Sequence, residues 1–317
     1  MSTSPHHALT LPPVIAAPMA GGPSTPALAN AVDFGFLALG TCSLKEAEDQ
    51  LAQVNAPYGV NLFYPQADEP QLSDINAVAK ELSVDVPSVD LTNGFAQKFA
   101  LILSLDNPPA VVSSTFGCFT VGEIDALHER GIEAWVTVTN PRDAEIASRR
   151  GADRLVVQGP EAGGHRSTWS IFEEPDQRPL AQLLSAVQEV SELPLIAAGG
   201  ARTSEDVADL IARGAQSVAC GSAFLLADEA GTSQFNRELL EAGGSSISTR
   251  AFSGRYARGM ETEFTRTHED MAALYPYLNA MLKPRRAEQE YAYCLVGIDP
   301  ERIHVGAASQ LQETLLP

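Results

Sequence analysis

Residues 156–165 read VVQGPEAGGH, an apolar strand that runs directly into a glycine-rich loop carrying a carboxylate and an imidazole. Residues 194–200, PLIAAGG, repeat the plan of an apolar strand followed by paired glycines. Strands that end in such loops are typical of a ligand site at the carboxyl edge of a parallel sheet. Paired glycines let backbone amides approach a phosphate, and the following helix adds the positive end of its dipole. The sequence therefore predicts a phosphate-binding edge, with His165 as the first catalytic candidate.

Strand-like segments recur along the first two thirds of the chain. Eight apolar runs predict strands at 13–17, 36–39, 58–63, 110–114, 134–138, 154–157, 194–198 and 217–220. Helix signals lie between them: Asn140-Pro141 offers an N-cap and an N1 proline, and Gly151 closes that segment. Alternating strands and helices with short connections predict a parallel sheet. Eight units in 317 residues favour an α/β fold of the closed (β/α)8 TIM barrel type over an open sheet.

The domain organisation follows from unit length and composition. We expect residues 1–229 to form the barrel, residues 230–293 a small helical lid subdomain, and residues 294–317 a segment that packs back on the barrel. The unit after Gln158 is roughly twice as long as its neighbours, and its extra segment, 161–178, contains His165. Long loops at the carboxyl face of a barrel usually serve the active site, although a surface insertion is the alternative.

Composition limits the classes of partner. The net charge of −19 and the sequence pI of about 4.6 argue against nucleic acid and anionic membranes. The four cysteines are widely spaced and form no CxxC pair, so neither a disulfide scaffold nor a metal site is expected, and a cytoplasmic location is the default. No signal peptide and no membrane-spanning run is seen. We expect a small-molecule substrate, and a homodimer is one assembly that we consider.

The glycines that end the seventh and eighth strands extend the phosphate hypothesis. In barrels, the loops after these two strands often bind phosphate. Gly199-Gly200 and Gly221-Ser222 occupy these positions, and Ser222 adds a hydroxyl. The alternative is that the glycines only allow tight turns, but their joint placement favours phosphate. His165 beside this site could act as a general base or as a hydrogen-bond donor to an anionic substrate.

Three further side chains suit a flavin. Asn61 and Gln158 end predicted strands, and each amide can both donate and accept hydrogen bonds, as the edge of a flavin ring requires. Met19 could pack on a ring face or belong to the barrel core. The basic cluster at 283–286 could reach the site, but a solvated helix end is the favoured interpretation.

Four segments together resemble a known family, the nitronate monooxygenases, formerly called 2-nitropropane dioxygenases. They are residues 17–22 (APMAGG), 59–63 (GVNLF), 158–165 (QGPEAGGH) and 196–200 (IAAGG). The resemblance covers most of the chain, and the EAGGH loop after a strand is a fairly specific signal.

The resemblance implies a flavin enzyme. It implies a TIM barrel that contains FMN, carries a helical substrate lid and oxidises alkyl nitronates with O2 to a carbonyl compound and nitrite. In that chemistry the nitronate passes an electron to the flavin, which passes it to oxygen. His165 would be the active-site histidine. The residues around FMN would be Ala17, Pro18, Met19, Asn61, Gln158, Gly159, Gly163, Gly164, Ala198, Gly199, Gly200, Gly221 and Ser222.

Two alternatives stay open. The first is an NAD(P)H-dependent flavin reductase on the same barrel, of the enoyl-acyl-carrier-protein reductase or quinone reductase type. The second is a non-redox barrel enzyme that binds a phosphate ligand, such as an aldolase. Aldolases of this type generally need a Schiff-base lysine, and no lysine ends a predicted strand here.

Overall fold

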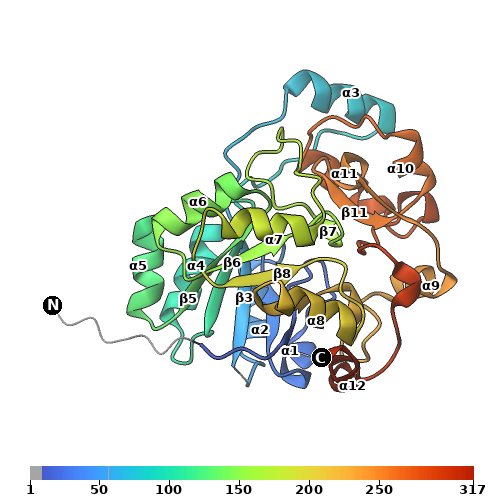
Figure 1. Ribbon diagram of the computed structural model, residues 1–317. Coiled ribbons are helices and arrows are strands. Elements are labelled where there is room, and N and C mark those ends of the chain that lie inside the picture. The colour runs from blue at the N-terminus through green and yellow to red at the C-terminus, as the bar shows by residue number, and fades with distance from the viewer. Residues whose placement is uncertain (1–8, 56) are drawn as a thin grey trace.

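A closed barrel of eight parallel strands forms the centre of the computed structural model, which describes residues 9–55 and 57–317 (Figure 1). In barrel order the strands are β1 (Val14–Ala16), β2 (Gly35–Ala38), β3 (Tyr58–Phe63), β4 (Val111–Thr115), β5 (Glu133–Val138), β6 (Arg154–Gln158), β8 (Leu195–Ala198) and β9 (Ala215–Cys220). Strand β9 pairs with β1, with Val218 opposite Val14, and this pairing closes the barrel. The predicted TIM barrel and all eight predicted strands are confirmed. The first eight residues of the expected barrel segment 1–229 lie outside the described residues.

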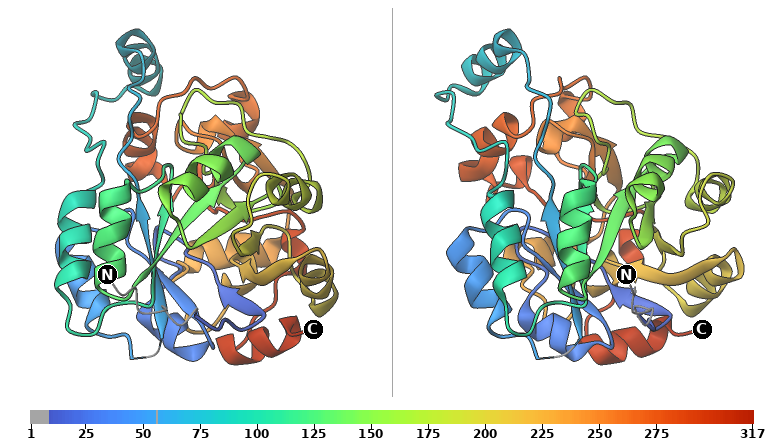
Figure 2. Two further views of the ribbon diagram at one scale, coloured as in Figure 1. Left: turned by 60° about the vertical axis from the view of Figure 1, so that its left-hand side comes forward. Right: turned by 90° about the vertical axis from the view of Figure 1, so that its left-hand side faces the viewer.

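Helices surround the strands, as the two views of Figure 2 show. They are α1 (Pro26–Ala31), α2 (Leu44–Leu51), α4 (Phe95–Ser104), α5 (Val121–Glu129), α6 (Pro141–Arg150), α7 (Leu180–Gln188) and α8 (Ser204–Ala212); α3 (Leu72–Leu82) stands away from the barrel. Helix α6 begins as the sequence predicts: Asn140 accepts a hydrogen bond from the Asp143 amide, proline follows the cap, and Gly151 ends the helix at φ 94°. These boundaries fix where each βα loop begins.

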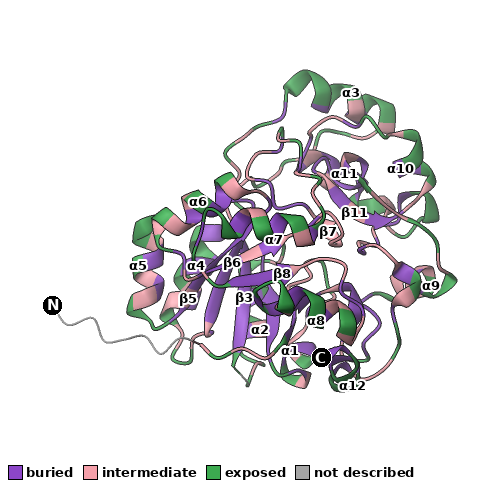
Figure 3. Cartoon of the chain, in the orientation of Figure 1, coloured by how far each residue is buried: buried purple, intermediate pink, exposed green. Residues whose placement is uncertain are grey.

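The helices around the barrel have a buried and an exposed face, and the barrel strands are buried along nearly their whole length (Figure 3). The interior of the barrel near the start of the strands holds Phe34, Phe36 and Trp135, whose rings lie within 6.5 Å of one another. Apolar side chains facing inward make this end a packed core and not a pore.

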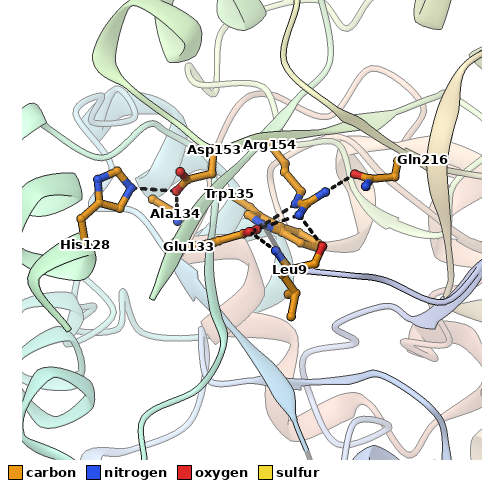
Figure 4. A network of polar contacts seen from close by, with 8 residues as sticks. All are labelled: Leu9, His128, Glu133, Ala134, Trp135, Asp153, Arg154 and Gln216. Atoms are coloured by element: carbon orange, nitrogen blue, oxygen red, sulfur yellow. Dashed lines mark hydrogen bonds and ion pairs between the residues drawn. The ribbon is translucent and has the colours of Figure 1, made fainter. Parts of the chain in front are cut away.

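A polar network closes the same end of the barrel (Figure 4). Glu133 accepts hydrogen bonds from Arg154 Nε and from Trp135 Nε1, both at 2.8 Å, and from the Leu9 amide at 3.0 Å. The Arg154 side chain is only 3% exposed. Burial alone would raise the pKa of Glu133, but the hydrogen bonds from Arg154 and Trp135 lower it, so the carboxylate stays ionised. This network stabilises the end of the barrel opposite the loops that follow the carboxyl ends of the strands.

The segment from residue 230 to residue 293 covers the other end of the barrel. It contains α9 (Gln234–Ala242), α10 (Glu263–Thr267), α11 (Tyr277–Leu282) and the short 3-10 turns Arg250–Phe252, Lys283–Arg285 and Gln289–Tyr291. Besides the expected helices it contains two strands, β10 (Ser246–Thr249) and β11 (Ala257–Met260). These strands form a three-stranded sheet with β7 (Gly164–His165) in the order β10-β11-β7. The proposed limits of this lid at 230 and 293 stay a prediction.

Helix α3, which belongs to the loop after β3, packs on the lid. Ile75 and Ala79 lie in one apolar cluster with Phe264, Leu278 and Met281. Figure 1 places α3 at the same end of the molecule as α10 and α11. The cover over the site therefore has contributions from two distant parts of the chain.

The last part of the chain returns to the barrel. A 3-10 turn, Pro300–Arg302, precedes α12 (Ala308–Leu315), and α12 packs against α1 and α8. Ala308, Leu311 and Leu315 lie on its buried face. Among the described residues, no helix is both long enough and apolar enough to cross a bilayer.

Candidate active site

The loop that carries His165 is held in place by the strand before it. The Gln158 side chain donates from Nε2 to the His165 carbonyl and accepts at Oε1 from the Ser167 amide, each at 2.9 Å. On the other side, β7 pairs with β11, with His165 opposite Ala257. Glu161 accepts hydrogen bonds from the Leu180 amide at 3.0 and 3.2 Å and so caps α7. The long loop is therefore anchored to the barrel and to the lid, and Gln158 and Glu161 act as its anchors.

The His165 ring lies among aromatic rings and makes one hydrogen bond. Its Nε2 lies 2.7 Å from the Ser253 hydroxyl oxygen. The ring centroids of Tyr275, Phe116 and Tyr293 lie 5.4, 5.7 and 6.4 Å from that of His165. Burial, together with the charges of two nearby arginines, lowers the pKa of His165 to about 3. The imidazole is therefore neutral at physiological pH, with Nδ1 making no hydrogen bond among the described residues.

Arg255 is one of the two arginines and joins three parts of the chain. Its guanidinium donates to the Thr168 carbonyl at 2.6 Å and to Gln66 Oε1 at 3.3 Å. Its Cζ lies 4.1 Å from the Phe116 ring centroid. Burial lowers the pKa of Arg255 to about 10, so the group keeps its charge at neutral pH. Arg255 thus fixes the lid relative to the long loop and to the segment after β3.

Arg286 is the second arginine and comes from the basic cluster at 283–286. The sequence favours a solvated helix end, which fits the exposed Lys283. Arg286 instead donates to the Phe252 carbonyl at 2.7 Å and to Asn279 Oδ1 at 3.1 Å. Its Cζ lies 3.9 Å from the Tyr293 ring centroid, and burial lowers its pKa to about 10. The helix-end interpretation is therefore wrong for Arg286, because a turn after α11 directs this residue inward.

The predicted glycines gather at the ends of β6, β8 and β9. Gly199 and Gly200 have φ of 136° and 79°, which strongly favours glycine. A Cβ on Gly163 would lie 2.5 Å from the Gly297 nitrogen, so only glycine fits there. Within the described part of the chain, the amide nitrogens of Gly199, Gly200 and Gly221 donate no hydrogen bond. Free amides at adjacent strand ends are what a phosphate group requires.

Two residues that sequence reasoning missed complete this cradle. The Gly297 amide donates to the Ser222 hydroxyl oxygen at 2.9 Å. Arg202 donates to the Ile298 carbonyl at 3.0 Å, and its buried Nε has no partner among the described residues. The position of Arg202 shortly after the paired glycines was an available signal. Gly297 gave none, because only the tertiary fold brings it to the strand ends.

The remaining predicted flavin contacts fall into three groups. A Cβ on Gly221 would lie 3.6 Å from Ala17 and 3.7 Å from Met19. The loop after β9 therefore lies against the loop after β1, which also contains Pro18. The prediction that Asn61 ends its strand is wrong, because β3 continues to Phe63. Asn61 is buried, and its Nδ2 donates to the hydroxyls of Ser113 at 2.8 Å and of Thr115 at 3.0 Å. At the strand ends, Ala198 pairs in register with Gln158 and Ala219, and the Gly159 amide donates to the Ala198 carbonyl at 2.9 Å. The structure thus brings Gln158 and the predicted glycines to one edge of the barrel, with Asn61 inside β3, and the glycine cradle fits a nucleotide phosphate.

Comparison with known proteins identifies the family. The nitronate monooxygenase family model matches residues 4–297. A nitronate monooxygenase of Paraburkholderia phytofirmans is 31% identical over 312 residues, covering 89% of this chain and 84% of that protein. A probable nitronate monooxygenase of Staphylococcus saprophyticus is 30% identical over 300 residues, covering 87% of this chain and 84% of that protein.

Solved structures agree in fold. A nitroalkane oxidase from Streptomyces ansochromogenes has a TM-score of 0.86 and 32% identity, covering 96% of this chain and 94% of that chain. FabK from Thermotoga maritima, at 23% identity and a TM-score of 0.69, covers 96% of this chain and 91% of that chain and shares the fold. The chain therefore belongs to the nitronate monooxygenase family of oxidoreductases.

Proposed function

We propose that this chain is an FMN-dependent enzyme that oxidises alkyl nitronates with O2 to a carbonyl compound and nitrite. The observation that carries the proposal is the position of His165. A neutral imidazole lies on the long loop after β6, under the lid, at the barrel edge where the glycine cradle forms. Family membership supports the same chemistry.

The cofactor would be held by two sets of groups. The free amides of Gly199, Gly200 and Gly221 and the Ser222 hydroxyl would bind the phosphate, while residues 17–19, Asn61 and Gln158 would lie along the ring and ribityl chain. Bound there, FMN supplies electron transfer between the nitronate and O2. The protein orients the two reactants and sets the charge around them.

His165 would act through its free ring nitrogen. In the tautomer that carries its proton on Nδ1, Nε2 accepts from the Ser253 hydroxyl, and Nδ1–H can donate a hydrogen bond to a substrate oxygen. Ser253 and the Gln158 contact to the His165 carbonyl fix the ring position. A group with so low a pKa is a weak base, which suits a substrate that arrives already deprotonated.

The test is product analysis with purified, FMN-loaded protein. Ethyl nitronate in air should give nitrite and acetaldehyde and should consume O2, whereas NADH should not be oxidised at a comparable rate. NADH oxidation in the absence of nitrite formation would contradict the proposal and favour a flavin reductase. The likeness to FabK does not favour the reductase, because at 23% identity it shows the fold alone.

The cytoplasmic location and a homodimer are further proposals; sedimentation analysis tests the dimer.

A further inference from the structure

Two adjacent arginines after α11 have different surroundings. Arg285 stacks over Tyr291, with Cζ 3.5 Å from the ring centroid, and pairs with Glu288 at 3.0 Å. Arg286 stacks in the same way on Tyr293, at 3.9 Å, but its acceptors are the Phe252 carbonyl and the Asn279 side-chain oxygen. A carboxylate neutralises Arg285, whereas the acceptors of Arg286 are uncharged.

The charge of Arg286 therefore has no local counterion. Neither Arg286 nor the buried Arg255 lies within 4.0 Å of a carboxylate oxygen in the described part of the chain. His165, which the charges of both arginines affect, is neutral. Partly buried cations without a counterion are costly unless an anion completes the site. On a chain of net charge −19, this is a local positive site beside the catalytic histidine.

Arg286 also has donors to spare. Its Nη2 makes both hydrogen bonds to the protein. Its Nε and Nη1 make none within the described residues, and neither is among the fully buried atoms that lack a partner. Nε of Arg255, by contrast, is buried. Of the two cations, Arg286 is the one that can reach a small ligand.

A nitronate has the geometry that such a group recognises. Its two oxygens lie in one plane on a single nitrogen and share the negative charge, as the two oxygens of a carboxylate do. Because Nη2 of Arg286 is bound to Phe252 and Asn279, the guanidinium would bind one of these oxygens through a single charge-assisted hydrogen bond from Nε or Nη1. A neutral nitroalkane has the same shape but no net charge to complete the site.

We propose that Arg286 binds the anionic oxygens of the substrate beside His165 and so selects the nitronate over the neutral nitroalkane. This inference rests on the proposed function and adds to it the residue that sets substrate charge. Arg255, which has a buried guanidinium and three structural contacts, fixes the lid and does not bind substrate.

The experiment compares Arg286→Gln and Arg286→Lys with Arg285→Gln as the matched control. In FMN-loaded protein, calorimetry measures the Kd for nitrate, a planar anion of similar shape, and steady-state assays measure kcat and KM for ethyl nitronate and nitroethane. We expect Arg286→Gln to raise the nitrate Kd and the nitronate KM about ten- to a hundredfold. Arg286→Lys keeps the charge but not the guanidinium donors, and its Kd and KM should lie between those of Arg286→Gln and the wild type; Arg285→Gln should match the wild type.

The outcomes separate this inference from the proposed function. Equal nitrate Kd values in Arg286→Gln and Arg285→Gln would overturn the role of Arg286. The same holds if Arg286→Gln weakens FMN binding but leaves the nitrate Kd at the wild-type value. If Arg286→Gln does not fold, a wild-type nitrate Kd in Arg286→Lys overturns the role of the guanidinium donors. A wild-type protein that binds nitrate through Arg286 but does not oxidise nitronate would refute the proposed function alone.

Discussion

His165 shows how surroundings decide the chemistry of a single residue. Its sequence position offers two roles, a base or a hydrogen-bond donor. Apolar rings and two arginine charges then hold it neutral, and Ser253 fixes one ring nitrogen. The EAGGH loop made His165 predictable. Ser253 and Arg286 were not, because they come from distant segments and reach the site only through the pairing of β7 with β11 and the turn after α11.

Replacing His165 tests its role directly. His165→Ala should keep FMN, since the cradle glycines do not depend on this side chain, but should lose about 10²-fold or more in kcat/KM for nitronate. Absorbance gives the bound FMN, and nitrite release gives the rate. His304→Ala, at an exposed position, is the control. Wild-type kinetics in His165→Ala would rule out a direct part for the imidazole.

The low pKa of His165 has a measurable pH signature. A folded-state pKa of about 3, against about 6.5 for an unfolded histidine, means that only the unfolded chain takes up this proton between those values. The contribution of His165 to stability is therefore present above about pH 6.5 and is lost as the pH falls toward 3. Histidine-selective NMR should show a neutral ring from pH 8 down to about pH 4. A titration midpoint near 6.5 for His165 would contradict this environment.

At the scale of elements, sequence pattern predicted what is locally encoded. The eight barrel strands are apolar runs, and the capping signals of α6 stand next to one another in sequence. Strands β7, β10 and β11 were not predicted, because segments of two to four residues are too short to show an alternating apolar pattern. Their pairing also depends on the tertiary fold. The glycine cradle was half readable: Gly199 and Gly200 follow a strand, whereas Gly297 is placed only by the return of the chain end.

The cradle itself can be tested with one methyl group. In Gly221→Ala the new Cβ meets Ala17 and Met19 at ordinary contact distances, and the backbone φ of −99° suits alanine. The fold should therefore be unchanged, while a flavin packed against these residues should bind about tenfold more weakly. Gly122→Ala, at an open position in α5, is the matched control. Equal FMN affinity in the two variants would move the flavin away from Gly221.

At the scale of the whole molecule, stability and chemistry lie at opposite ends of the barrel. Arg154 and Glu133 begin β6 and β5, whereas Gln158 and the cradle glycines stand at or beyond strand ends. The fold class followed from eight repeating units. The sequence could not predict which lid residues enter the site, because the lid and the barrel are joined by tertiary contacts that local patterns do not record.

This separation predicts a variant that loses stability without losing specific activity. Glu133→Gln leaves the buried Arg154 guanidinium without its counterion and should lower the free energy of unfolding by about 3–5 kcal/mol. Nitronate turnover per folded molecule should stay near the wild-type value. Denaturant unfolding and nitrite assays measure the two effects. A large fall in turnover with unchanged stability would reverse the assignment of the two ends.

The central claim is that a flavin at this barrel edge takes electrons from nitronate. The direct measurement is the flavin absorbance of the FMN-loaded protein after anaerobic mixing with ethyl nitronate, compared with NADH. We predict that nitronate reduces the flavin within the turnover time, that NADH does not, and that admitted O2 restores the spectrum. A flavin absorbance that is unchanged by nitronate but is lost on adding NADH would contradict the account and assign the chain a reductase activity.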